Sequence, residues 1–243
     1  MTHCFTNMSL IIGKIREELA SEADAKTRKS LQRFFKEKIT LYGVKTAVVR
    51  KIANKHWSEV KLFSKPQFFS LCEELFRSDY TEEAFVASFW LEKMVEQLEP
   101  SSLKVLKKWI ALYINNWAKC DTLCNHTVGG LIEKYPESVN ELKSWAKSEN
   151  RWLKRAAAVS LIIPAKKGKF LLDIFEICTV LLPVEDDVVH KGYGWLLKEA
   201  SRRHQKEVMD YVLKNRNVMP RTALRYAIEL MPKELRTEAM RKD

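Results

Sequence analysis

A repeat of amphipathic helical segments constrains the fold of this chain more than any other feature. Within each segment hydrophobic residues recur at helical spacing, and short polar or proline-containing breaks separate the segments. The first helices of successive repeats start about 36, 33, 36 and 34 residues apart, near Glu82, Ala118, Arg151, Asp187 and Arg221. A second helical segment fits after each of the first four starts. Prolines mark the breaks at Pro100, Pro136, Pro164, Pro183 and Pro220.

Repeats of this length are typical of helix pairs that stack on one another, because a single pair cannot bury its apolar face alone. Seven Gly and seven Pro in 243 residues are too few for an all-β chain with many tight turns. The sequence therefore predicts an all-α fold, an α-solenoid of HEAT-like helix pairs with a concave basic groove. We expect one HEAT-like repeat domain over residues 1–243, with the first helices, about 1–40, as an N-terminal cap. A helix over residues 26–43 is expected to stop at Gly43.

The charge of the chain indicates an anionic partner. Its net charge is +11 and its pI about 9.4, and most of the excess lies in residues 150–243, with 19 Lys and Arg against 12 Asp and Glu. Such a balance fits nucleic acid, an anionic membrane surface or an acidic protein, and charge alone does not choose among them.

The cysteines and the apolar segments indicate a reducing, intracellular location. The five cysteines are scattered, and no basic and apolar leader precedes them. The strongest apolar run is interrupted by Asp173 and Glu176, so it is not expected to span a bilayer. We expect a cytoplasmic protein without a membrane partner, in which the thiols are buried as small apolar side chains.

The stretch "NNWAKCDTLCNH", residues 115–126, gathers candidate metal ligands. Cys120 and Cys124 are neighbours on a helix, whereas His126 points to the far side from Cys124. No second cluster completes four ligands, so we predict neither a metal site nor a cofactor.

Trp117 and Asp121 in the same stretch are four residues apart and share a helical face. Each also has a structural interpretation, which is core packing for Trp117 and an N-cap or a solvated acid for Asp121. In the next repeat, Arg155 lies at the edge of an apolar stripe, and its alternative interpretation is a solvated base. Gly192 and Gly194 fall within a helical pattern and indicate close approach of another helix or of a ligand.

The repeat register predicts a row of charged residues. Asp121, Arg155, Lys191 and Arg225 occupy equivalent offsets about one repeat apart. With regular stacking, one acid and three bases would lie across adjacent helices. Such a row could hold a phosphate backbone along the bases and present the acid to another group.

Three motifs in register resemble a known family. They are the Trp-x-x-x-Asp of Trp117 and Asp121, "RWLKRAA" with Arg155, and "GWLLKEA" with Trp195. Their order on successive helices resembles the AlkD-like DNA alkylation repair glycosylases, over about residue 28 to the end.

The resemblance implies an enzyme that excises cationic N3- and N7-alkylated purines from duplex DNA and leaves an abasic site. It implies a catalytic carboxylate at Asp121 and DNA contacts from Trp117, Arg155 and Trp195, with Lys191 and Lys198 as further DNA-binding candidates. The expected partner is duplex DNA containing alkylated bases, with no obligatory protein partner, and the protein is expected to act as a monomer.

The chain departs from the family pattern at two places. Lys198 stands where many members have Arg, and "RFFKEK" stands where some members carry a tyrosine near the lesion. Two other classes of function stay open from sequence. One is a HEAT-repeat module that binds nucleic acid without catalysis, and the other is a scaffold for an acidic protein.

Overall fold

The computed structural model describes the backbone of residues 2–241 and the side chains of residues 7–241. Every regular element in that part of the chain is helical, and it contains no strand, so the predicted all-α class is confirmed. The chain divides into two compact units, Met1–Gln97 with Leu112–Leu123 and Leu98–Ala111 with Cys124–Asp243. The expectation of a single domain and that of a concave basic groove both stay predictions.

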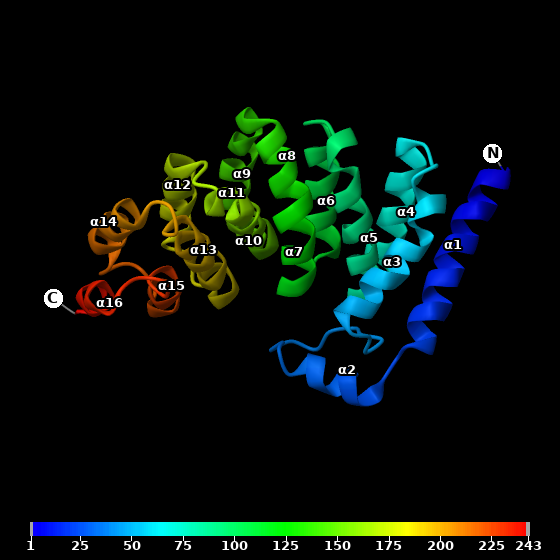
Figure 1. The fold of residues 1–243 in the computed structure, drawn as a ribbon, viewed down its shortest axis with the longest axis horizontal. Helices are drawn as coiled ribbons and strands as arrows, with labels where there is room; N and C mark the ends of the chain where they lie inside the picture. The colour runs from blue at the N-terminus through cyan, green and yellow to red at the C-terminus, as the bar shows by residue number, and fades with distance from the viewer. Residues whose placement is uncertain (1, 242–243) are drawn as a thin grey trace. The chain divides into compact units, whose positions relative to one another are not determined.

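The first unit is built around one buried helix (Figure 1). Its helices are α1 Thr2–Ser21, α2 Ala25–Gln32, α3 Thr46–Val60, α4 Lys65–Arg77, α5 Thr81–Met94, the short 3₁₀ helix η1 Val95–Gln97 and α7 Trp117–Leu123. Helices α1, α3, α4 and α7 all pack against α5. Most side chains of α5 are buried as a result, including the two acids of its first turn, Glu82 and Glu83.

The second unit has two layers of helices. It begins with α6 Ser102–Tyr113, whose residues up to Ala111 belong to this unit. The other elements are the π-helix η2 Cys124–Val128, α8 Gly129–Lys134, the 3₁₀ helix η3 Pro136–Ser138, α9 Val139–Ala146, α10 Arg151–Val159, α11 Ile162–Lys166, α12 Leu171–Leu181, α13 Asp187–Ala200, α14 Gln205–Asn215, α15 Arg221–Ala227 and α16 Lys233–Met240. Helices α10, α13 and α15 pack in succession as one layer. The second helices α9, α12, α14 and α16 form the other.

The predicted repeat is confirmed at the level of helix starts. The first helices of the repeats begin within one residue of the expected positions, at Thr81, Trp117, Arg151, Asp187 and Arg221. Capping side chains explain part of this accuracy. Asn150 accepts hydrogen bonds from the backbone N–H groups of Trp152 and Leu153, and Asp186 accepts one from that of Val188.

Two predictions about helix breaks are wrong. The helix expected over residues 26–43 ends at Gln32, because the Gln32 side chain hydrogen-bonds the backbone of Glu37 and Ile39 in the turn that follows. Gly43 has a φ of +93° in a non-helical segment, so it does not end a helix. Pro164 lies inside α11 and not in a break. It is the third residue of that helix, where a missing N–H costs no intrahelical bond.

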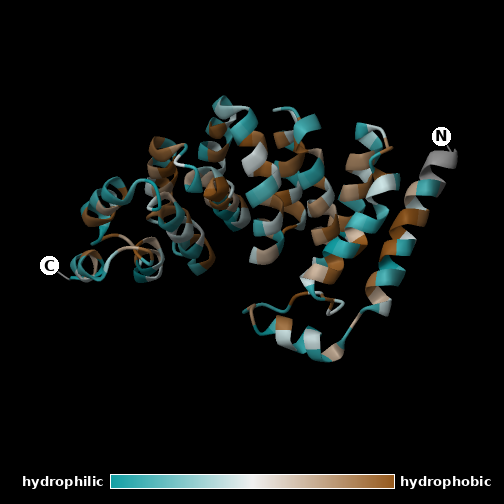
Figure 2. Cartoon of the chain, in the orientation of Figure 1, coloured by the Kyte–Doolittle hydropathy of each residue, from teal (hydrophilic) through white to brown (hydrophobic). Residues whose placement is uncertain are grey.

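Most of the helices are amphipathic. In Figure 2, hydrophobic and hydrophilic residues alternate around the helices of both units. The largest fully buried side chains include Trp90 and Phe68 in the first unit and Trp145 and Tyr193 in the second. None of the helices in the described part of the chain is both long and apolar enough to cross a bilayer.

Candidate functional site

Helix α7 carries Trp117 and Asp121 one turn apart, as predicted. The helix is capped by Asn116, whose side-chain oxygen accepts a hydrogen bond of 2.9 Å from the backbone N–H of Lys119. Asp121 is the fifth residue of α7 and is half-buried, so its N-cap interpretation is wrong. Three residues after Asp121 the helix widens into the π-helix η2, a rare geometry that is frequent at functional sites.

Trp117 is not a core residue, because 38% of its surface is exposed. One face of its ring stacks on Phe35, with ring centroids 5.1 Å apart and planes inclined by 21°. Its indole Nε1–H donates a hydrogen bond of 3.3 Å to the backbone oxygen of Phe34. Both contacts fix the orientation of the indole and leave part of it in solvent.

These aromatic residues surround a small cavity in the first unit. Its volume is about 130 Å³. Besides Glu82, it is lined by mainly apolar side chains, which are those of Leu31, Phe34, Phe35, Leu41, Val44, Thr46, Thr81, Phe85, Trp117 and Ala118. We call it the Trp117 cavity. The segment that closes it, residues 33–45, is non-helical, so other groups must hold it in place.

Glu82 holds that segment. Its carboxylate is 2% exposed and accepts hydrogen bonds from three consecutive backbone N–H groups, those of Tyr42 at 3.1 Å, Gly43 at 2.8 Å and Val44 at 3.1 Å. A buried carboxylate with three such donors stays bound to the backbone it faces. The segment that stacks Phe35 on Trp117 is therefore tied to the first turn of α5.

Further polar contacts surround this anchor. Glu83 accepts hydrogen bonds from the Arg16 guanidinium and from the Tyr42 hydroxyl, the latter at 2.8 Å. The Lys119 ammonium, on α7, donates to the backbone oxygen of Asp79 at 2.6 Å and to its carboxylate at 3.0 Å. Burial would raise the pKa of Asp79, but hydrogen bonds from Thr40 and Lys119 outweigh it and hold the pKa below its usual range.

Glu82 and Glu83, which hold the segment around the Trp117 cavity, could not be predicted from the sequence. Acids in the first turn of a helix are normally solvated charges that complement the helix dipole, so their pattern gave no sign of burial. The one sign in the sequence that this segment packs against another element was the double Phe of "RFFKEK", an apolar pair in a strongly charged stretch.

In the second unit, Arg155 is buried against α13. It is only 5% exposed, and its Nη1 donates a hydrogen bond of 2.5 Å to the backbone oxygen of Val188. The interpretation of Arg155 as a solvated base is therefore wrong. A phosphate contact from this residue stays a prediction.

Trp195, on α13, is oriented by a buried carboxylate. Its Nε1–H donates to Glu199 Oε1 at 3.1 Å, and Arg202 Nε donates to Glu199 Oε2 at 2.6 Å. Burial would raise the pKa of Glu199, but Arg202, Lys166 and the Trp195 indole outweigh it, so the pKa lies below its usual range. The ionised carboxylate fixes the half-exposed indole. Glu199 was also missed, although its spacing of four residues from Trp195 was a usable signal.

The two predicted lysines of α13 both have acidic neighbours. Lys191 Nζ lies 2.8 Å from Asp187 Oδ2 on the same helix, and Lys198 Nζ lies 3.1 Å from Glu229 Oε2. The Lys198 ammonium also lies 5.8 Å from the ring centroid of Tyr226. The Lys191–Asp187 pair is exposed on both sides and contributes little to stability, whereas the Lys198 side chain is only 17% exposed.

The two glycines of α13 permit close packing, as predicted. A Cβ at Gly194 would lie 2.8 Å from the backbone oxygen of Ala223 on α15, so the neighbour there is another helix. At Gly192 the nearest atoms belong to the Arg155 side chain, at 3.4 and 3.5 Å.

The thiols of residues 115–126 are packing residues. Cys120 and Cys124 are fully buried, as are Cys72 and Cys178, whereas His126 is exposed. Cys4 lies outside the residues whose side chains are described. Among the described residues, no group of three or more His, Cys, Asp or Glu side chains could hold a metal ion.

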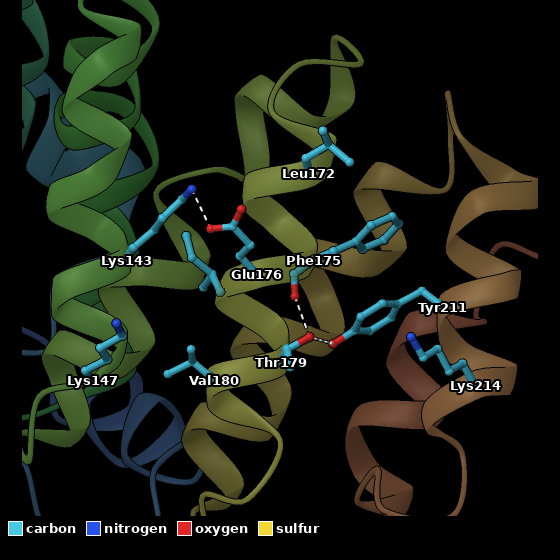
Figure 3. A pocket seen from close by; sticks show the side chains of 10 residues that line it. Lys143, Lys147, Leu172, Phe175, Glu176, Thr179, Val180, Tyr211 and Lys214 are labelled. Atoms are coloured by element: carbon cyan, nitrogen blue, oxygen red, sulfur yellow. Dashed lines mark hydrogen bonds and ion pairs between the residues drawn. The ribbon is translucent and has the colours of Figure 1, made fainter.

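The second unit also contains a larger groove on its outer layer of helices, α9, α12 and α14 (Figure 3). Its volume is about 620 Å³. Phe175 and Tyr211 stack across it with ring centroids 4.7 Å apart, and Lys143 is bound to Asp173 and Glu176. None of the predicted site residues lines this groove.

The structure thus brings the predicted residues together in two sets. Helix α7 of the first unit carries Trp117 and Asp121, and the packed helices α10 and α13 of the second carry Arg155, Lys191, Trp195 and Lys198. That both sets serve one site stays a prediction.

Comparison with known proteins identifies the family. A family model described as "DNA alkylation repair enzyme" matches residues 15–231. A solved structure described as "Predicted DNA alkylation repair enzyme from Enterococcus faecalis" is similar with a TM-score of 0.78 and 14% identity. The match covers 87% of this chain and 98% of the chain in that structure. At that identity the likeness shows the fold alone. No curated protein sequence matches the chain. Because the family model spans all but the two ends of the sequence, the protein belongs to the DNA alkylation repair enzyme family, as its AlkD-like motifs indicated, and has a role in alkylation repair.

Proposed function

We propose that the protein is a monofunctional DNA glycosylase. It hydrolyses the N-glycosidic bond of cationic N3- and N7-alkylated purines in duplex DNA and leaves an abasic site. The observation that carries the proposal is the pairing on α7, in a member of a DNA alkylation repair family, of a half-buried carboxylate with an oriented, partly exposed indole one turn away.

The chemistry of the reaction suits these two side chains. Alkylation at N3 or N7 gives the purine a positive charge and makes it a good leaving group. As the glycosidic bond breaks, positive charge moves onto the deoxyribose. The Asp121 carboxylate stabilises that charge or orients the attacking water. The face of a tryptophan attracts a cation by about 0.5–2 kcal/mol, which assigns the alkylated base to Trp117 and Trp195.

The remaining predicted residues bind the DNA backbone. Lys191 and Lys198 supply point charges to phosphates, and Arg155 is the proposed arginine contact to a phosphate. No cofactor takes part in this mechanism. The product is an abasic site without strand cleavage, because no amine nucleophile is required.

The proposal is tested by base release from duplexes that carry 7-methylguanine or 3-methyladenine. We expect release of at least one of these bases by the wild-type protein. Salt-sensitive binding without release of either base would instead favour the non-catalytic nucleic-acid-binding module.

The role of Asp121 has its own test. Asp121→Asn keeps the size of the side chain but removes its charge, so we expect base release to fall by about 10²-fold or more while DNA binding persists. Asp210→Asn, an exposed carboxylate on α14, is the matched control and should keep wild-type activity. Full activity of Asp121→Asn would show that another group supplies the charge.

A further inference from the structure

The C-terminal helices α15 and α16 form a basic groove that contains Arg225, the last base of the predicted row, and extends from it onto α16. Its volume is about 580 Å³. Four of its lining side chains are basic: Arg225, Lys233, Arg236 and Arg241. The Arg221 guanidinium, whose Nη2 lies 3.4 Å from the backbone oxygen of Met240, links α15 to the end of α16.

The four bases are all exposed to solvent. Among the residues whose side chains are described, none of the four forms an ion pair with a carboxylate. Glu229, the acid that lines the groove, is bound to Lys198. In contrast, Lys143 in the groove of Figure 3 lies within hydrogen-bonding distance of two carboxylates. Unpaired bases that share one concave surface create a positive potential that attracts an anionic ligand.

The Glu229–Lys198 contact links one lining residue of this groove to a base of α13. Helix α13 packs on α15, and the contact joins the two across that interface. We propose that the groove formed by α15 and α16 binds the phosphate backbone of the duplex, beyond the segment held by Lys191 and Lys198. The identity of the ligand as duplex DNA rests on the proposed function.

Several bases in one groove suit the closely spaced phosphates of a duplex. Three of the four bases are arginines, whose planar guanidinium groups donate paired hydrogen bonds to phosphate oxygens. Duplex DNA offers one phosphate charge per about 1.7 Å of its axis, so several bases in one groove can each meet a phosphate. Such contacts add affinity and position the duplex but do not read its sequence.

The test measures how DNA affinity depends on salt. For wild type and for the double variant Lys233→Gln/Arg236→Gln, the dissociation constant of an undamaged duplex is measured at a series of salt concentrations. Each lost phosphate contact makes the plot of log association constant against log salt concentration less steep by about 0.9. We therefore expect the double variant to have a slope that is smaller in magnitude by about 1.8. The loss of affinity should be the same for an undamaged and an alkylated duplex.

A matched variant separates a local contact from the general loss of charge. Lys147→Gln/Lys214→Gln removes two exposed lysines from the groove of Figure 3 and should keep the wild-type slope. Equal slopes for all three proteins would overturn the proposal and favour an acidic protein segment as the ligand. An equal fall in both variants would also overturn it, as would a wild-type protein that does not bind duplex DNA. Base release is assayed separately on wild type, so its absence would reject the glycosylase activity and leave the salt result to decide the groove.

Discussion

At the scale of single residues, the two predicted tryptophans, one in each unit, are held by different groups but to the same effect. The Trp117 indole N–H is bound by a backbone oxygen and its ring by Phe35. The Trp195 indole N–H is bound by the Glu199 carboxylate. Each ring is thereby oriented before any ligand binds, and preorganisation of this kind reduces the cost of ordering side chains on binding.

The stack on Trp117 predicts different effects for two adjacent phenylalanines. Phe35→Ala removes the ring that faces Trp117. It should lower the free energy of unfolding by about 1–2 kcal/mol, since a stacked aromatic pair contributes about 0.5–1.5 kcal/mol beyond its buried area. Phe34→Ala, at a side chain that is 68% exposed, should change it by less than about 0.5 kcal/mol. Urea unfolding of both variants measures the difference. Equal effects would mean that the stack does not stabilise this segment.

Sequence could predict the aromatic and acidic residues of α7 but not what surrounds them. Trp117 and Asp121 follow from helical spacing, which is local. The anchoring of residues 33–45 depends on Glu82, about 40 positions away, and no local pattern distinguishes a buried carboxylate from a solvated one. The burial of Arg155 could not be predicted from the sequence for a related reason. Helix α10 is covered by α9, α12 and α13, so a residue at the edge of its apolar stripe is buried as well.

At the scale of helices, α13 packs through glycines. A glycine within a helix costs about 1 kcal/mol relative to alanine, and this cost is offset only where a side chain would prevent close packing. At Gly194 the added Cβ would meet both the backbone oxygen of Ala223 and the Cβ of Tyr226 at 2.8 Å. At Gly192 its neighbours are side-chain atoms of Arg155 at ordinary van der Waals distance.

These distances predict opposite signs for two identical substitutions. Gly194→Ala should lower the free energy of unfolding by about 1–2 kcal/mol, because overpacking costs about 1–3 kcal/mol and outweighs the gain in helix propensity. Gly192→Ala should keep or raise it, by up to about 1 kcal/mol. Thermal and urea unfolding of the two variants provide the comparison. A stabilising Gly194→Ala would show that α15 moves away at little cost.

Helix starts were predictable and one helix end was not, for a physical reason. A start depends on the local apolar period and on a capping side chain such as Asn150 or Asp186, both of which sequence shows directly. The end of α2 depends on Gln32 binding the turn that follows and on Glu82 binding residues 42–44. Tertiary contacts of this kind override helix propensity.

At the scale of the whole molecule, partly buried ionised acids couple stability to pH. Besides the exposed Asp24, four carboxylates in the described part of the chain have pKa values below their usual range: Glu18, Asp79, Glu133 and Glu199. In each case burial alone would raise the pKa, and hydrogen bonds from basic or polar side chains outweigh it. Glu133, for example, accepts hydrogen bonds from Lys167 at 2.7 and 3.0 Å and from Lys169 at 3.0 Å.

Lowered carboxylate pKa values predict loss of stability in acid. As the pH falls, the unfolded chain binds protons before the folded one does. The stabilisation by these carboxylates is therefore complete above the ordinary pKa of about 4.5 for Glu, and it is lost as the pH falls through the lower pKa values of the folded protein. Protonation also raises the positive charge above +11 and adds repulsion. We expect urea midpoints that change little between about pH 8 and 6 and fall steeply below about pH 4.5. Glu133→Gln removes one of these carboxylates, so its midpoint should depend less on pH over the acid range. A wild-type midpoint that stays constant down to about pH 3 would mean that these pairs are as weak as exposed ones.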